Sequence, residues 1–417
     1  MSALPLLLLG APEKAESWCR SWRASLPACR VLVLLAATDT AAVPGISAAG
    51  TSPESRRVTA AADAELLVLG PTVALPHALP PLPAGVSPAL ISQVVLQGLG
   101  LHPIVVDLGC PVAPAVSHLR LPPPAGAGPA RCLSTGSAMD RTRVEALLEQ
   151  GRRWGRAAAR SAPSAGPLPL PLVLAECVPG GTTTAQAVLT GLGIESGGIV
   201  SGSLHRPAHA LKADLVARGL AAAAARTLVP AGARRLPPDP VAVLAALGDP
   251  MQALAAGLLL AAAETGQSVL LAGGSQMAAV LALALALLTP ELRPRLAALA
   301  AIGTTAWVAF ESDSDLTLLL RRIGRHWGID HPLAFAASLR FRGALHPALQ
   351  DYERGYVKEG VGAGGLAILW ELAGRSPEHL ARACDAACHE LIGPPCAPPA
   401  CHLVAPGSGD PLRSGDG

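Results

Sequence analysis

The chain has 417 residues, of which 51% are hydrophobic and 15% are charged, and its formal net charge is +2. This composition predicts a sizeable buried core. The weak, unclustered positive charge argues against nucleic acid as a partner, because surfaces that follow phosphates need clustered cations. Nine cysteines are scattered along the chain and no export signal is evident, so we expect a protein of the reducing cytoplasm.

Short apolar runs recur along the chain, and each ends in Gly or in a small polar cluster. Uniform runs of this kind predict strands that are buried on both faces, as in a parallel sheet. The first run is interpreted as a strand rather than a signal peptide, because no positively charged segment precedes it. In chain order the runs occupy residues 5–10, 31–36, 65–70, 103–109, 171–176 and 268–274.

Ala/Leu-rich segments of helical length separate these runs, for example at residues 141–160, 183–193 and 251–264. Alternating strands and helices predict a doubly wound α/β body, whose sites lie at the carboxyl ends of the strands. No membrane span is expected at residues 269–288, because polar residues interrupt the stretch and favour a strand followed by a helix. Residues 393–417 are rich in Pro, Gly and Ser, which predicts a disordered tail.

The most informative segment, residues 171–193, combines a strand ending at Glu176 with a Gly/Thr loop and a helix. The backbone N–H groups of such a loop, the positive end of the helix and the threonine hydroxyls can together bind an anion. A tight turn with a Thr N-cap, and a purely structural Glu176, is the alternative interpretation. The candidate phosphate-binding residues are Gly180, Gly181, Thr182, Thr183 and Thr184.

A second Gly-rich loop, within residues 356–374, begins at Glu359 and leads into another predicted helix. A carboxylate among glycines and apolar residues can have a raised pKa, which suits a general base. A Glu stabilised by the helix dipole is the alternative. Gly360, Gly362 and Gly365 also match the dinucleotide fingerprint, but only weakly, because no acidic residue ends a second strand about 20 positions later.

Small and hydroxyl residues end two further apolar runs, as a sugar-phosphate site at the strand ends requires. They are Gly273, Gly274 and Ser275, and then Gly303 and Thr304.

Two other features are given no role. The Cys/His cluster near the C-terminus does not match a common zinc spacing, so we predict no metal site. Lys212 is interpreted as a solvent-facing cation. The cluster comprises Cys384, Cys388, His389, Cys396, Cys401 and His402.

The strings AECVPGGTTT and KEGVGAGGLA, with ALGDPMQALAAG, VLLAGGSQM and IGTTAWVA between them, resemble the nicotinate-nucleotide:dimethylbenzimidazole phosphoribosyltransferase family. The nearer match is the branch found in archaea and cyanobacteria, and the resemblance is best over residues 85–375. It implies a three-layer Rossmann-like α/β body with a mostly parallel sheet and a smaller helical part. It also implies one catalytic domain over residues 1–392, a homodimer, and no metal or cofactor.

The resemblance implies roles for individual residues. Glu359 takes the position of the family's general base, and Glu176 takes that of a supporting acidic residue. The loop after Glu176 takes the place of the phosphate and ribose site, and residues 85–93 resemble the base-binding segment, with Ser87 and Gln93 near the base. The family's Asn-Thr-Thr is Thr-Thr-Thr here, which leaves dimethylbenzimidazole, other benzimidazoles and adenine open.

The expected reaction transfers a phosphoribosyl group from nicotinate mononucleotide to a benzimidazole-type base. Its products are nicotinate and an α-riboside 5′-phosphate for the lower ligand of cobalamin. Two alternatives stay open: a non-catalytic relative that binds a nucleotide, and a nicotinamide-dependent oxidoreductase that uses the second Gly-rich loop. An ordered strand before Glu359 would support the oxidoreductase.

Overall fold

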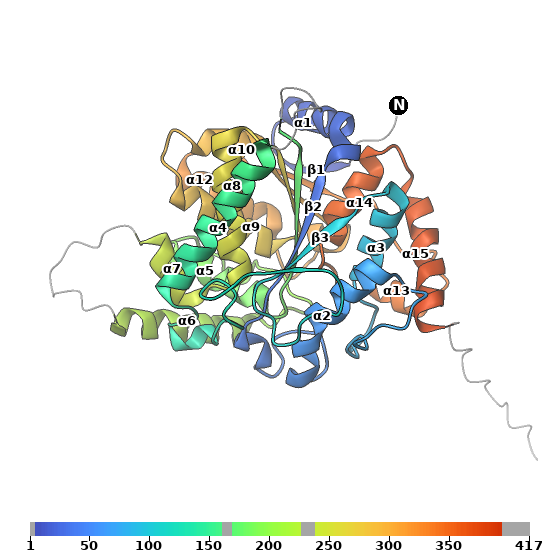
Figure 1. The fold of residues 1–417 in the computed structure, drawn as a ribbon, viewed down its shortest axis with the longest axis horizontal. Helices are drawn as coiled ribbons and strands as arrows, with labels where there is room; N and C mark the ends of the chain where they lie inside the picture. The colour runs from blue at the N-terminus through green and yellow to red at the C-terminus, as the bar shows by residue number, and fades with distance from the viewer. Residues whose placement is uncertain (1–4, 161–168, 227–237, 394–417) are drawn as a thin grey trace, which may run out of the picture.

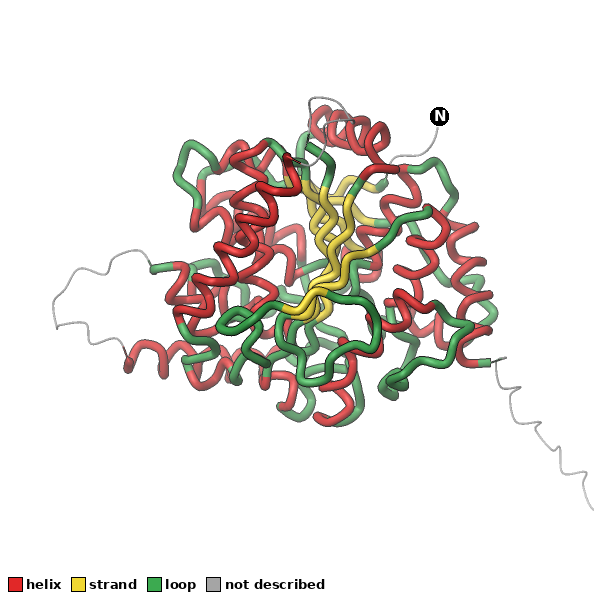
Figure 2. The backbone as a smooth tube through the Cα atoms, viewed as in Figure 1, coloured by secondary structure: helices red, strands yellow, loops and turns green. Residues whose placement is uncertain are grey.

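Eight strands form one sheet through the middle of the protein (Figures 1 and 2). The structure, a computed structural model, describes residues 5–160, 169–226 and 238–393. The strand order is β1-β8-β7-β6-β5-β2-β3-β4, with β1 antiparallel to β8 and every other pair parallel. The strands are β1 Leu6–Leu9, β2 Arg30–Leu35, β3 Pro103–Asp107, β4 Leu119–Arg120, β5 Leu172–Cys177, β6 Val269–Ala272, β7 Ala300–Thr304 and β8 Leu333–Ala336.

The mostly parallel sheet predicted from the apolar runs is confirmed, with one exception. The run at 65–70 was expected to be a strand, but it is the last turn of helix α2 (Pro53–Leu69). A capping box between Ser52 and Ser55 starts this helix, and a short apolar run cannot by itself be distinguished from one turn of a buried helix.

Helices cover both faces of the sheet, which gives the expected three layers (Figure 1). One face carries α4 Arg141–Arg160, α5 Gly181–Gly191, α6 His209–Arg226, α7 Pro240–Leu247, α8 Pro250–Thr265, α9 Ser275–Leu287, α10 Arg293–Leu299 and α12 Leu316–Trp327. The other face carries α1 Pro12–Ser25, α2, α3 Ala89–Leu99, α13 Pro347–Glu353, α14 Ala363–Leu372 and α15 Pro377–Ile392. Short helices complete the chain: α11 Ala306–Ala309, η1 Leu26–Ala28, η2 Asp39–Ala42 and η3 Leu133–Thr135.

Glycine allows the closest helix contact on the first face, between α4 and α8. A Cβ atom at Gly151 of α4 would lie 2.2 Å from the carbonyl oxygen of Leu254. A Cβ atom at Gly257 of α8 would lie 2.1 Å from the carbonyl oxygen of Leu148. The two backbones therefore pack without intervening side chains.

The stretch at 269–288 folds as predicted, into β6 and then α9. Within residues 5–160, 169–226 and 238–393, no helix is long and apolar enough to cross a membrane. The predicted tail lies, from residue 394 onward, outside the residues that the structure describes.

The order of the strands reverses between β2 and β5, which are neighbours. Strands β3 and β4 continue on the β2 side, whereas β6, β7 and β8 continue on the β5 side. Such a switch point leaves a crevice outside the carboxyl ends of the two central strands, where ligands bind in open α/β sheets. The register pairs Leu35 of β2 with Cys177 of β5, so both strands end at the same level.

Candidate active site

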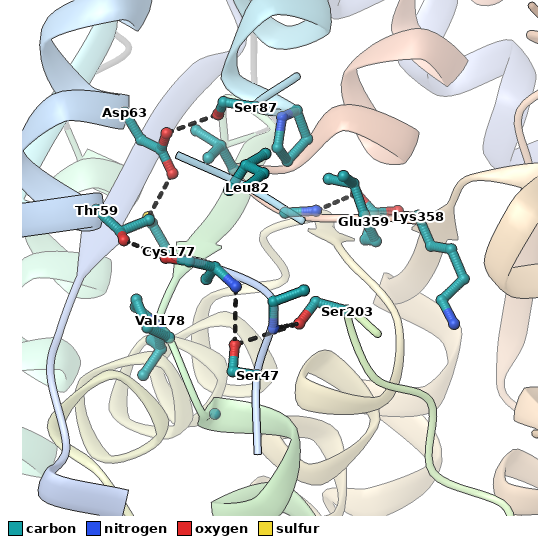
Figure 3. A pocket seen from close by; sticks show the side chains of 18 of the residues that line it. Ser47, Thr59, Asp63, Leu82, Ser87, Cys177, Val178, Ser203, Lys358 and Glu359 are labelled. Carbon is teal, nitrogen blue, oxygen red and sulfur yellow. Dashed lines mark hydrogen bonds between the residues drawn. The ribbon is translucent and has the colours of Figure 1, made fainter. Parts of the chain in front are cut away.

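A cavity of about 310 Å³ opens at this switch point (Figure 3). Its walls come from residues 47–49 after β2, residues 176–182 after β5, residues 274–276 after β6, and the loop 357–361 before α14. Segments far apart in the sequence thus meet at the carboxyl edge of the sheet. The predicted site residues that line the cavity are Ser87, Glu176, Gly180, Gly181, Thr182, Gly274, Ser275, Glu359 and Gly360.

The other predicted residues lie outside this lining. Thr184 is fully buried and donates a hydrogen bond to Asp249, with 2.5 Å between the oxygens. Gln93 lies on α3, where its amide donates to Gln97 at 3.1 Å. Their binding roles, like those of the rest of this group, stay predictions. The group comprises Gln93, Thr183, Thr184, Gly273, Gly303, Thr304 and Gly362.

The loop after β5 needs glycine at two positions. Gly180 has a φ of +78° as the N-cap of α5, and a Cβ atom there would lie 3.0 Å from the backbone nitrogen of Ala41. A Cβ atom at Gly181 would lie 1.8 Å from Oε1 of Gln276. The N-terminus of α5 therefore reaches the cavity without covering side chains, and its positive end favours a bound anion.

Glu359 is half-buried at the cavity wall, and four groups donate hydrogen bonds to its carboxylate. One oxygen accepts from the Thr304 hydroxyl at 3.0 Å and from the Thr305 N–H at 2.9 Å. The other accepts from the N–H groups of Gly360 at 3.2 Å and Gly364 at 3.0 Å. Burial raises the pKa of Glu359 above its ordinary value, and these hydrogen bonds oppose the rise.

Lys358 anchors the backbone that presents Glu359. Its φ is +59°, in the left-handed region that side chains seldom adopt. Its buried ammonium forms an ion pair with Glu311 and donates to the carbonyl oxygen of Leu204 at 2.8 Å. These contacts hold a strained loop in place from behind, because the ammonium lies on the side away from the Glu359 carboxylate (Figure 3).

Lys212 was expected at the surface, and that interpretation is wrong. The side chain is fully buried, and its ammonium donates to the carbonyl oxygen of Ser201 at 2.5 Å. Burial lowers its pKa to about 7; Glu311 nearby opposes the change and Lys358 adds to it. Helix α6 turns this residue inward, under the cavity-lining segment 201–203, so the general tendency of lysines to face solvent does not hold here.

Glu176 lies deeper in the cavity wall than Glu359. It accepts a hydrogen bond from the Val178 N–H at 3.3 Å and is held by the Gln276 side chain. Burial raises its pKa well above the ordinary value, and the charge on Glu359 raises it further. The two glutamates thus face one cavity, with the deeper one the harder to ionise.

Sequence reasoning missed Asp63, a third carboxyl in the lining. It comes from α2 and accepts from the Ser87 hydroxyl at 2.6 Å and from the Cys177 thiol at 3.5 Å (Figure 3). Burial raises its pKa to about 6, against these two hydrogen bonds. The segment was expected to contain a strand, so no signal marked Asp63 as part of a site. A helical interpretation of residues 53–69 would have placed it on the inward face.

The C-terminal Cys/His cluster can be placed in part. Cys384 and Cys388 are packed in the core along α15, whereas Cys396, Cys401 and His402 lie outside the described residues. In the described part of the chain, no group of three His, Cys, Asp or Glu side chains could hold a metal ion.

The oxidoreductase hypothesis requires a strand before Glu359. From α13 to Glu359, all of which the structure describes, the backbone forms turns and no strand. The Gly360–Gly365 match to the dinucleotide fingerprint therefore lacks its structural context.

The sequence is similar to a known family and to several known proteins. The family model described as phosphoribosyltransferase matches residues 92–298. A UPF0284 protein of Prochlorococcus marinus (strain MIT 9313) is 50% identical over 384 residues, which cover 91% of this chain and 90% of the relative. UPF0284 protein SYNW1869 of Parasynechococcus marenigrum (strain WH8102) is 49% identical over 382 residues and 90% of each chain.

Among solved structures, the nicotinate-nucleotide-dimethylbenzimidazole phosphoribosyltransferase of Thermus thermophilus is similar at 19% identity and a TM-score of 0.47, over 91% of this chain and 92% of that one. This likeness is too distant to assign a substrate. The closely similar sequences are decisive: the chain belongs to the UPF0284 family, and the phosphoribosyltransferase family model matches its residues 92–298.

Proposed function

We propose that the protein transfers the phosphoribosyl group of nicotinate mononucleotide to a benzimidazole-type base, giving nicotinate and an α-riboside 5′-phosphate for the lower ligand of cobalamin. The observation that carries the proposal is the Glu359 carboxylate, which four donors hold at the wall of a cavity at the switch point. The match to the phosphoribosyltransferase family model supports the same class of reaction.

The nucleotide phosphate would bind at the N-terminus of α5. Gly180, Gly181 and Thr182 line the cavity there, and the helix dipole favours a negative charge. Such binding would place the ribose near the glutamates, because Glu176 is the next-to-last residue of the strand that leads into the same loop. Positioning of this kind supplies most of the catalysis when both reactants are held in contact.

The displacement then needs one proton acceptor. The lone-pair nitrogen of the base attacks the anomeric carbon, and the bond from that carbon to the pyridinium nitrogen breaks. Its electron pair returns to the ring, so nicotinate leaves with a neutral ring nitrogen. The N–H proton on the other nitrogen of the attacking base passes to Glu359, so the product carries no cation on its base. A single displacement inverts the anomeric centre, which converts the β-nucleotide into the α-riboside.

Glu176, with its raised pKa, would stay protonated during this step and could donate a hydrogen bond to the ribose. The proposal takes residues 1–392 as one catalytic domain that works as a cytoplasmic homodimer without a metal or a cofactor. The competing function is nucleotide binding without catalysis. Catalytic turnover distinguishes the transferase from such a non-catalytic relative.

The test is a product assay with the purified full chain, nicotinate mononucleotide, and either dimethylbenzimidazole or adenine. Chromatography would follow free nicotinate and the new nucleotide, and NMR would assign the anomeric configuration. We expect both products in equal amounts, with the α configuration. Binding of nicotinate mononucleotide without product from any base would contradict the transferase and favour the non-catalytic relative.

A further inference from the structure

The part of the cavity beyond Glu359 combines an apolar wall with one buried carboxyl, that of Asp63. Leu82, Val86 and Pro88 line it, together with Ser87 and Asp63 (Figure 3). Apolar walls suit an aromatic ring, but a carboxyl at such a place is costly unless it is hydrogen-bonded. Its presence therefore calls for a reason beyond packing.

Asp63 is incompletely satisfied by the protein. Within the described residues it accepts from Ser87 and from the weakly donating thiol of Cys177, and it forms no ion pair. A carboxylate offers about four acceptor positions, so about two positions on this cavity-lining residue have no donor among the described residues. A partner that donates a hydrogen bond would meet this demand.

The cavity wall runs from Glu359, past Pro88 and Ser87, to Asp63. The ring of Pro88 lies 2.9 Å from where a Cβ atom of Gly360 would be, next to Glu359. Ser87 follows along the wall and bonds to Asp63. A fused base that offers the N–H of its five-membered ring to Glu359 would extend its six-membered ring along this wall toward Asp63.

Hydrogen bonds hold this wall in place, so it can discriminate between acceptor bases. The Gly85 N–H donates to Asp351 at 2.7 Å, and the Tyr352 hydroxyl donates to the carbonyl oxygen of Val86 at 2.8 Å. Both partners belong to α13, so the segment that carries Ser87 is fixed at its start. A fixed polar group rejects ligands that leave it unpaired more strongly than a hydrophobic pocket rejects a change of shape.

We propose that Asp63 is a specificity-determining residue, and that this chain prefers a fused imidazole base with an amino donor on its six-membered ring over one whose ring is bare or methylated. The inference rests on the proposed function, because it assumes that the base enters with its five-membered ring toward Glu359. It narrows the acceptor to the aminopurine type, for which adenine is the probe.

Adenine and purine form a matched pair of probes, because they differ only in the exocyclic amine. Isothermal titration calorimetry of each base into the full chain, without nicotinate mononucleotide so that no turnover occurs, would compare their affinities. We expect adenine to bind about tenfold or more tightly, the factor that a hydrogen bond to a charged group provides. Asp63→Ala should reduce the ratio to about twofold or less, and Asp63→Asn, which keeps the side-chain size, should reduce it in part.

Glu65→Gln is the control, since Glu65 is a buried carboxyl on the same helix that bonds His77 and Ala115 and does not line the cavity. It should keep the full preference. Equal affinities in the wild-type protein, or an undiminished preference in both Asp63 variants, would overturn the inference. Release of nicotinate, measured separately, decides the proposed function: if no base releases it, the transferase fails while the calorimetry still decides the role of Asp63.

Discussion

The two Gly-rich loops of the cavity begin their helices in the same way but hold their glutamates differently. Gly180 caps the N-terminus of α5 and Gly362 that of α14, and both glycines have a left-handed φ. Glu176 is the next-to-last residue of a buried strand and receives one backbone hydrogen bond, whereas Glu359 lies in a loop without a strand and receives three, plus one from the Thr304 hydroxyl.

One cavity can keep two carboxyls in different protonation states when their hydrogen bonding and neighbouring charges differ. Burial raises the pKa of both carboxyls, but four hydrogen bonds oppose the rise at Glu359, whereas the charge on Glu359 adds to the rise at Glu176. Groups whose surroundings separate their pKa values identify an acid and a base. The pair predicts an ionised Glu359 that accepts a proton and a neutral Glu176 that donates hydrogen bonds.

The largest effect is expected for Glu359→Gln. The amide keeps the shape of the side chain but cannot accept a proton, so kcat should fall about 10²–10⁴-fold. Steady-state kinetics of nicotinate release would measure it, and the affinity for nicotinate mononucleotide should stay close to that of the wild type. If the variant retained more than about a tenth of the wild-type kcat, Glu359 would not be the base.

Lys358→Met tests the anchor of the second loop. The change leaves Glu311 buried without its ion pair, which costs about 3–5 kcal/mol of stability. Denaturant unfolding would measure the loss. Lys14→Met, which removes an exposed ion pair with Asp330, is the matched control and should cost less than about 1 kcal/mol. Equal losses in the two variants would show that the buried pair does not hold the loop.

The pH dependence of kcat/KM should separate the two glutamates. The rate requires an ionised Glu359, so it should fall about tenfold per unit as the pH drops below its raised pKa. At higher pH, Glu176 loses its proton and places a second charge in the cavity, which should lower the rate again. The two apparent pKa values of this bell-shaped profile describe the coupled pair of glutamates and not either residue alone. A profile that is flat from pH 4 upward would contradict the assignment.

Glu176→Gln should have the smallest effect. A glutamine resembles a neutral carboxylic acid in size and in its donor, so kcat at neutral pH should fall less than about tenfold. The alkaline limb of the pH profile should disappear, because no proton remains to be lost at this position. If kcat instead fell as much as in Glu359→Gln and the alkaline limb stayed, Glu176 would be the base and Glu359 the supporting residue.

Much of the fold could be predicted from the sequence, because fully buried parallel strands leave uniform apolar runs. Strands β2, β3, β5 and β6 were found in this way, and so were helices α4 and α8. The run at 65–70 failed because a buried helix turn has the same composition as a short strand. That error also hid Asp63, which is visible only once residues 53–69 are seen as a helix.

The site was predictable where the backbone itself forms it. Gly180, Gly181 and Glu359 stand in loops whose sequence already suggests an anion cradle and a carboxylate, and all three line the cavity. Side chains that act over long sequence distances were not predictable. Lys212 was misjudged because its burial depends on the segment 201–203, which no local pattern reveals.

Chemical rescue would show whether the Glu359 carboxylate itself removes the proton. In Glu359→Ala the carboxylate is gone, and the space that it leaves at the cavity wall can admit formate. The rate of nicotinate release by this variant, measured against formate concentration, should rise from a low value toward saturation, while chloride at equal ionic strength should have no effect. A folded variant that binds nicotinate mononucleotide but shows no rise with formate would contradict Glu359 as the group that removes the proton.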